Sequence, residues 1–144
     1  MKRSILIAVA AVAILLPVSA ASAKGGGRPI EVLMTGAYER PGPGDPDGTG
    51  TASFRINPGE GQVCYTLAVA NIEAATLAHI HRAPSDRPGP IVVHLNPPTD
   101  GKSKGCAAVT SDLANEMIQT PSAFYVNVHN TPFPAGAVRG QLGR

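Results

Sequence analysis

Aromatic residues are scarce in this chain, which has no tryptophan, three tyrosines and three phenylalanines among its 144 residues. Its hydrophobic core must therefore be built largely from Val, Ile, Leu and Ala. Long apolar runs are equally few, because residues 5–16 form the only one. We therefore expect no membrane span once this run is removed. Internal repeats are absent as well, which excludes a repeat architecture.

Sequence signatures of several enzyme classes are missing. The chain has no G-x-S-x-G elbow, no phosphate-binding loop and no Cys–His nucleophile pair. A carboxylate pair of the glycosidase type is not visible either. Ser111 and Asp112 suggest a hydrolase with a histidine partner, but they fit the start of a helix better. The sequence therefore favours a protein that is not an enzyme.

The N-terminal residues have the pattern of an export signal. Lys2 and Arg3 precede the apolar run, Pro17 breaks it, and residues 21–23 form a small-x-small cleavage site. We predict a signal peptide at residues 1–23 and a periplasmic or secreted protein without a lipid anchor, since no cysteine follows the run. Of the twelve basic residues, ten then remain against ten acidic ones. This neutral balance gives no reason to expect nucleic acid or an anionic membrane as a partner.

Cysteine is limited to Cys64 and Cys106. In an oxidising compartment, two cysteines most simply form one disulfide. The alternative is a pair of unpaired, buried thiols. A metal-binding role fits them less well, because export normally oxidises them.

Short apolar runs separated by clusters of proline and glycine predict an all-β domain. The expected strands are 30–35, 51–56, 62–70, 75–82, 91–95, 124–129 and 137–142. Residues 111–119 have the capping signals of one helix, and residues 40–50, 84–90 and 96–105 are expected to be loops. The predicted fold is an antiparallel Greek-key β-sandwich or barrel with one short helix. After a flexible lead-in at residues 24–29, this domain occupies residues 30–144.

Alternation of apolar and polar residues indicates which side chains line the core of this domain. The expected core residues are Phe54, Tyr65, Leu67, Val69, Ile80, Val126 and Val128. On the strand at 124–129, the opposite side carries Tyr125, Asn127 and His129. Tyr38, Glu39 and Arg40 precede the first long loop, where they form either a contact patch or, more simply, a solvated turn.

The four histidines are the strongest candidates for a functional site. His79 and His81 share one face of their expected strand, because side chains two residues apart point the same way. Neutral imidazole is a good ligand for transition metals. The candidate ligands for one copper or zinc ion are His79, His81, His94 and His129. A zinc ion would require ligand nitrogens within roughly 3–4 Å of one another.

Two other interpretations of these strands stay open. In the first, the histidines hydrogen-bond each other, Tyr125, Asn127 or loop carbonyls and so hold the proline-rich loops. The second alternative is a polar pocket for an organic ligand. Its candidate residues are Tyr125, Asn127, Arg139 and Gln141. Arg139 suits an anion in this interpretation, although an ion pair or hydrogen bonds to a neighbouring strand is the simpler explanation.

Four segments together resemble the CHRD domain, which is named from chordin and also occurs in many exported bacterial proteins. They are Ala78-His79-Ile80-His81, the run from Gly89 to Leu95, Tyr125-Val126-Asn127-Val128-His129, and the run from Pro134 to Leu142. The resemblance covers roughly residues 30–142 and implies a β-sandwich or barrel. Family members often have Thr after the last histidine, where this chain has Asn130. Chordin antagonises a growth factor, but that role belongs to a larger protein and does not transfer.

A fainter resemblance links the chain to exported copper/zinc superoxide dismutases. It consists of the His-x-His strand, one disulfide, and Arg139 near the end of the chain. The histidine-rich zinc loop of those enzymes is absent, and four histidines are too few for both metals. The sequence therefore favours a non-enzymatic binding or structural module whose partner is an envelope or extracellular protein or glycan. The competing hypothesis is a copper or zinc protein, with dismutase-like redox activity as one variant.

Overall fold

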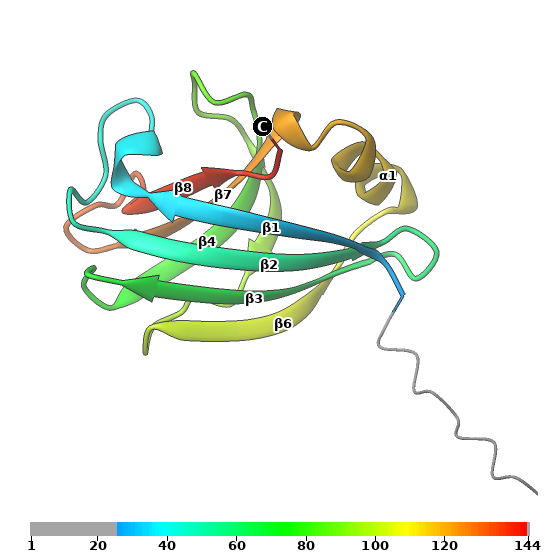
Figure 1. Ribbon diagram of the computed structural model, residues 1–144, viewed down its shortest axis with the longest axis horizontal. Coiled ribbons are helices and arrows are strands. Elements are labelled where there is room, and N and C mark those ends of the chain that lie inside the picture. Colours follow the sequence, from blue (N-terminus) through cyan, green and yellow to red (C-terminus); the bar gives the residue numbers. More distant parts are fainter. Residues whose placement is uncertain (1–25, 144) are drawn as a thin grey trace, which may run out of the picture.

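The computed structural model describes residues 26–143, which form eight β-strands, one α-helix and two short 3-10 helices (Figure 1). The predicted signal peptide, residues 1–23, lies outside the described residues. The strands are β1 (Arg28–Thr35), β2 (Thr49–Asn57), β3 (Gln62–Ala70), β4 (Ala75–Arg82), β5 (Ile91–Leu95), β6 (Lys102–Ala108), β7 (Phe124–Asn130) and β8 (Val138–Gln141). The helices are η1 (Gly36–Tyr38), α1 (Ser111–Gln119) and η2 (Pro121–Ala123).

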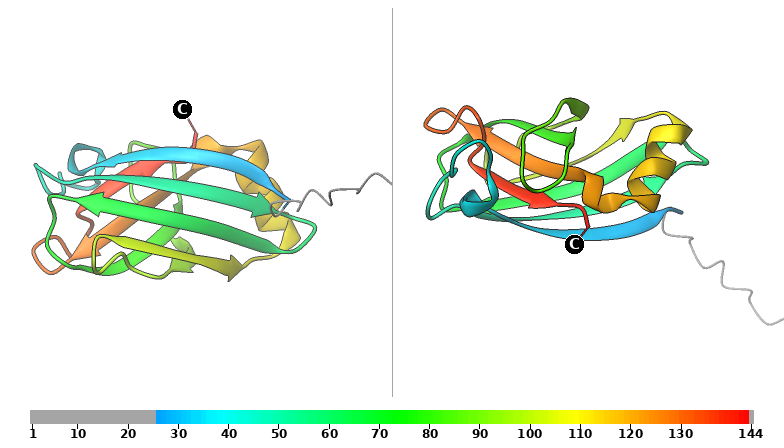
Figure 2. Two further views of the ribbon diagram at one scale, coloured as in Figure 1. Left: turned by 60° about the horizontal axis from the view of Figure 1, so that its bottom comes forward. Right: turned by 90° about the horizontal axis from the view of Figure 1, so that it is seen from above.

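All eight strands belong to one sheet in the order β5-β4-β7-β8-β1-β2-β3-β6, with antiparallel neighbours throughout. The sheet curls into a nearly closed barrel, so that the terminal strands β5 and β6 approach each other (Figure 2). Three neighbouring pairs, β3–β6, β4–β7 and β1–β8, are far apart in the chain. The predicted all-β antiparallel fold is confirmed. β1 begins at Arg28, two residues earlier than expected.

The core follows from strand alternation, because every second side chain faces inward. Ala52, Phe54 and Ile56 of β2 are fully buried. Thr51, just before them, and Arg55, between Phe54 and Ile56, are exposed. Six of the seven predicted core residues are buried, and the seventh, Val69, is partly buried against the same cluster. As the shortage of aromatic residues predicts, Val, Ile, Leu and Ala make up most of the core.

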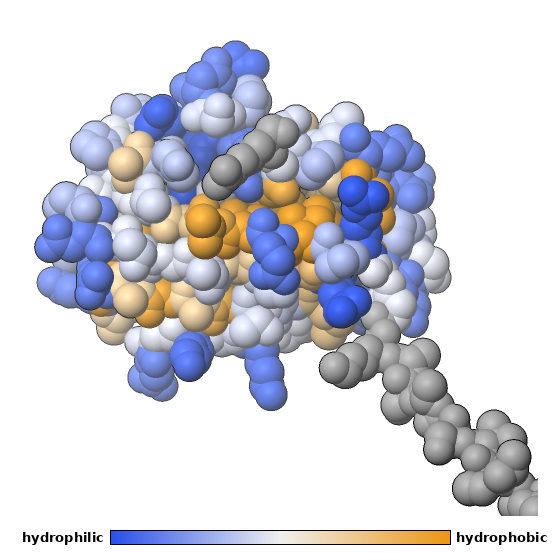
Figure 3. All heavy atoms as spheres, in the orientation of Figure 1, coloured by the Kyte–Doolittle hydropathy of each residue, from blue (hydrophilic) through white to orange (hydrophobic). Residues whose placement is uncertain are grey.

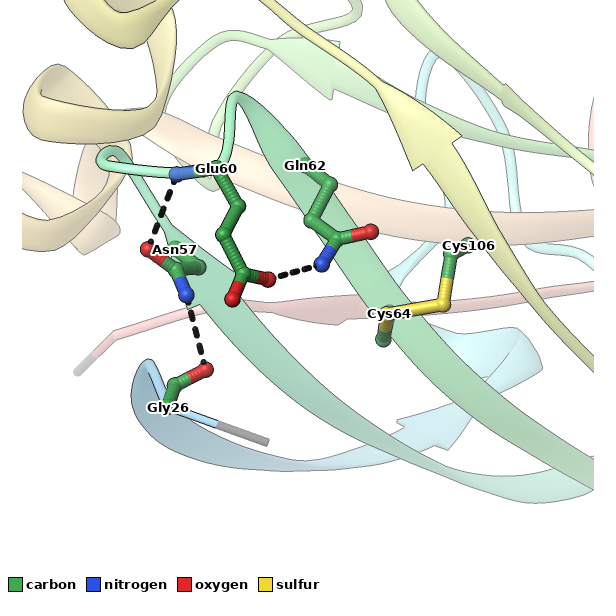
Figure 4. Close-up of a disulfide and its surroundings, with 6 residues drawn as sticks. All are labelled: Gly26, Asn57, Glu60, Gln62, Cys64 and Cys106. Carbon is green, nitrogen blue, oxygen red and sulfur yellow. Dashed lines mark hydrogen bonds between the residues drawn. A yellow bond between two sulfur atoms is a disulfide. The ribbon is translucent and has the colours of Figure 1, made fainter. Parts of the chain in front are cut away.

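Strand β6 corrects the sequence-based expectation of a turn-rich segment at residues 96–105. Lys102, Lys104 and Gly105 have low β-propensity, yet the segment pairs with β3 along its whole length. Within this pairing Cys64 lies directly opposite Cys106, and the two form the predicted disulfide (Figure 4). Cys106 is exposed, so the disulfide lies on the outer surface of the barrel. It holds β6, a terminal strand of the sheet, to its neighbour.

Helix α1 matches its predicted bounds and packs against the barrel at one end (Figure 1). The Thr110 side chain caps its start by accepting a hydrogen bond from the backbone N–H of Leu113 at 3.2 Å. Ala114 and Met117 are fully buried on its inner face. Among residues 26–143, no helix has both the length and the apolar character that crossing a membrane requires.

Candidate functional site

His79 and His81 project from the outer face of the barrel. Ala78 and Ile80, which alternate with them on β4, belong to the hydrophobic core. An outer face normally meets water, yet His79 is 5% exposed and His81 is 8% exposed. Long loops cover this part of the sheet and convert it into a second buried layer, one made of polar side chains.

Strand pairing brings a third histidine into this layer. On β7, Asn127 lies opposite His79, and His129 lies opposite Leu77. The Nδ1 atom of His79 is 3.2 Å from the Nε2 atom of His129. His79, His81 and His129 each offer one nitrogen, and these three atoms lie within 4.8 Å of one another. Two ligands of one ion lie at most about 4.2 Å apart, so small ring rotations would bring all three into ligating distance.

Hydrogen bonds to loop carbonyls orient two of these rings. The Nδ1 atom of His81 donates to the Gly89 carbonyl at 2.8 Å, and Nδ1 of His129 donates to the Pro134 carbonyl at 3.1 Å. A neutral imidazole carries one proton, so Nε2 of each ring keeps its lone pair. The Nε2 atom of His81 is buried and has no hydrogen-bond partner among the described residues. Backbone carbonyls commonly orient metal-binding histidines in this way.

Burial keeps these imidazoles neutral. It is the main reason that the pKa of His79 falls from 6.5 to about 4, and the neighbouring histidines lower that pKa further. Burial also lowers the pKa of His81 and of His129, although the carbonyls of Gly89 and Pro134 act in the opposite direction. Neutral imidazole is the form that binds metal ions. The cluster is therefore ready to bind a cation at neutral pH without first losing protons.

His94 occupies a different position from the other three histidines. It pairs directly with His79 across β4 and β5, and the two ring centroids are 5.0 Å apart. Its side chain therefore lies on the same face as the cluster. However, His94 is exposed and does not belong to the group of close nitrogens. The structure thus gathers three of the four predicted ligands and leaves His94 at the edge of the site.

Of the four predicted ligand-binding residues, two contact the clustered histidines directly: Tyr125 and Asn127. The Tyr125 ring stacks on His81 with centroids 4.7 Å apart, and the Arg139 guanidinium lies 3.4 Å from the Tyr125 centroid. Asn127 contacts Nε2 of His129 at 3.1 Å. Gln141 donates to the carbonyls of Ala83 and Ser122, so its amide is already engaged.

Arg139 holds the loop that covers His81. Its guanidinium donates to the carbonyls of Pro84 at 2.8 Å and Arg87 at 3.1 Å. These residues belong to the same loop as Gly89, whose carbonyl orients His81. Arg139 therefore makes the expected type of contact, hydrogen bonds to another segment of the chain. Its partners, however, lie in a loop and not in a neighbouring strand.

Glu39 is a buried residue that the sequence did not indicate. The simpler expectation, a solvated turn at residues 38–40, is wrong for this residue, because Glu39 is only 2% exposed. Its Oε1 atom has no hydrogen-bond partner in the described part of the chain. Burial raises its pKa to about 7, although Arg139 favours the charged form. A single Glu among turn residues is normally expected to be exposed to solvent. The sequence therefore carries no signal that this side chain is buried.

We predict that Glu39→Gln changes the pH dependence of stability in the metal-free protein. The raised pKa means that Glu39 holds an extra proton in the folded protein between pH 4.5 and about 7, so the contribution of this residue to the unfolding free energy falls as pH rises through this range. Glutamine cannot ionise, so the variant should gain up to about 3 kcal/mol over wild type above pH 7 and nothing below pH 4.5.

The buried histidines act in the opposite direction. Because the pKa of His79 falls from 6.5 to about 4, stability is lost as pH drops through this interval. The Glu39→Gln variant should therefore show a steeper loss in acid than wild type. Urea unfolding across this pH range measures both effects, and parallel curves for the two proteins would contradict the prediction.

A groove of about 1050 Å³ lies beside the polar layer, between β1, β8 and the loop that follows β4. Its lining includes Leu33, Tyr38, Arg40 and Asp86, together with Arg139 and Gln141. Leu33 is 62% exposed, and Figure 3 shows a band of apolar surface on the face that carries β1. None of the clustered histidines lines this groove. Arg139 lies between the two features, because it lines the groove and also packs on Tyr125 beside His81.

These features define an antiparallel β-barrel protein with a buried histidine cluster outside its hydrophobic core. The CHRD domain family matches residues 30–142, so the chain belongs to the CHRD family. No curated protein and no solved structure matches the chain. The match covers every strand from β2 to β8 and all four histidines.

Proposed function

We propose that this CHRD protein is an exported, non-enzymatic module that binds one transition-metal ion through His79, His81 and His129. The observation that carries the proposal is the convergence of three buried nitrogens within 4.8 Å. Removing three imidazoles from water costs free energy unless their polar atoms find hydrogen-bond or metal partners. A metal ion would satisfy the unpartnered Nε2 atom of His81 and use the two neighbouring nitrogens as well.

The donor set favours copper or zinc. Imidazole nitrogen suits both metals, whereas magnesium and calcium prefer oxygen ligands. Three imidazoles leave a coordination position open, as in metal sites that exchange their ion or bind a further ligand. In the metal-bound state, the His79 proton would sit on Nε2, which frees Nδ1 beside His129 for the ion.

The Cys64–Cys106 disulfide supports the location outside the cytoplasm, where such bonds persist. The N-terminal signal pattern of the sequence supports it independently. In such a compartment, a protein with a single imidazole site would store, buffer or transfer a metal ion. This role requires no further catalytic residue, which agrees with the absence of enzyme signatures in the sequence.

Metal analysis of purified protein tests the proposal. We expect wild type to bind one equivalent of copper or zinc and the His79→Ala/His81→Ala variant to bind none. A copper(II) sample of wild type should show nitrogen hyperfine splitting in its electron paramagnetic resonance spectrum. Superoxide removal by the copper-loaded protein tests the redox alternative on the same samples. Equal, near-zero metal content in wild type and variant would overturn the proposal.

A further inference from the structure

His94 is the exposed member of a row of imidazoles that leads to the buried cluster. The His94 and His79 centroids are 5.0 Å apart, and the His79 and His129 centroids are 5.1 Å apart. His94 is exposed, His79 is 5% exposed and His129 is 7% exposed. Because β5 is a terminal strand of the sheet, the row begins at an exposed residue on the sheet edge and leads to the buried histidines.

The other sides of the cluster are closed by contacts. The Gly89 carbonyl holds His81 at 2.8 Å, and the Pro134 carbonyl holds His129 at 3.1 Å. Tyr125 stacks on His81 with an interplanar angle of 2°. An ion that approached from these sides would have to break the hydrogen bonds that orient the ligands. From the side of His94 both loop carbonyl contacts stay intact, and only the contact between Nδ1 of His79 and Nε2 of His129 has to open.

We propose that His94 is the entry ligand of the metal site: it binds the ion at the surface and passes it to His79, without remaining in the final coordination sphere. This inference rests on the proposed function. A ring rotation of His94 and His79 allows both to hold one ion, because their rings are already in contact. Stepwise exchange between imidazoles keeps at least one nitrogen on the ion while it loses water, which lowers the barrier to entry.

Stopped-flow kinetics with zinc(II) alone as the probe tests this role in the mature protein. We expect His94→Ala to slow both zinc uptake and release to a chelator by about tenfold, since association rates of related variants span about one to three decades. The dissociation constant should stay within about twofold, because both rates change together. His94→Asp should restore part of the rate, because a carboxylate also binds zinc. His94 is exposed, so these variants should fold normally.

Thr66→Ala is the control, because Thr66 is an exposed residue of β3, a strand that does not pair with those that carry the histidines. Its rates should equal those of wild type. A His94→Ala variant with wild-type rates would overturn the inference and leave the three-histidine site intact. Weakened equilibrium binding with unchanged uptake would also overturn it, because His94 would then be a resident ligand. Wild type that binds no zinc or copper would instead overturn the proposed function itself.

Discussion

Replacing His129 with alanine is expected to lower the affinity for copper or zinc by at least about 100-fold. The loss of a partner that merely orients a ligand already costs about 10–100-fold, and His129 is a proposed ligand itself. Its Nε2 atom lies 3.2 Å from Nδ1 of His79, the separation expected for two nitrogens on one ion. No other side chain of the cluster can take its place, because Asn127 offers only an amide.

Competition with a chromophoric chelator near neutral pH measures this affinity. Thr66→Ala is a suitable control, because Thr66 is exposed on β3 and lies on the other side of the barrel. Excess metal at 100 times the dissociation constant should stabilise wild type by about 2.7 kcal/mol and the His129→Ala variant hardly at all. Unchanged affinity in a folded His129→Ala protein would exclude this residue as a ligand.

Removal of the disulfide by Cys64→Ser/Cys106→Ser is expected to lower the unfolding free energy by about 4 kcal/mol. The bond joins residues 42 positions apart, and a loop of this length restricts the unfolded chain by about that amount. It also secures β6, whose lysines and glycine favour strand formation weakly. We therefore expect β6 to be the strand most affected in the variant.

Urea unfolding measures the loss, and hydrogen exchange locates it along the chain. Backbone amides of β6 should lose protection first, whereas those of β4 and β7 should keep it. Metal affinity should not change while the variant remains folded, because the histidines lie on strands that do not pair with β3 or β6. A stability loss below about 1 kcal/mol would show that the β3–β6 pairing needs no covalent support.

The strands that the sequence predicted best are those with clear alternation. β3 matches its expected bounds, because core and outer side chains alternate along most of its nine residues. β4 also matches its bounds, although its alternation is regular only from Ala78 to His81. β6 was missed because its inward positions hold small or polar residues, among them Ser103 and Gly105. Its strand conformation comes from pairing with β3, a partner about 40 residues away in the chain. Local pattern carries no information about such a contact.

The candidate site was predicted in composition but not in arrangement. Alternation alone places His79 and His81 on one face of β4. It does not decide that β7 is the neighbour of β4, nor that the paired registers bring His129 to His79 and His94 to the edge. Nor could the sequence indicate that loop carbonyls of Gly89 and Pro134 would orient the rings. These contacts depend on how the proline-rich loops fold back over the sheet.

Residue types and their local order are enough to predict the all-β class, most strand positions, the disulfide pair and the histidines of the candidate site. These properties follow from residue type and from the two-residue period of a strand, which neighbouring residues set. Three features depend on long-range packing: which strands are neighbours, which outer face the loops bury, and the burial of Glu39 beside this polar layer. Each of these features depends on contacts between segments far apart in the chain. Such contacts form only when the whole barrel packs, because their free energy must exceed the conformational entropy that ordering the segments costs.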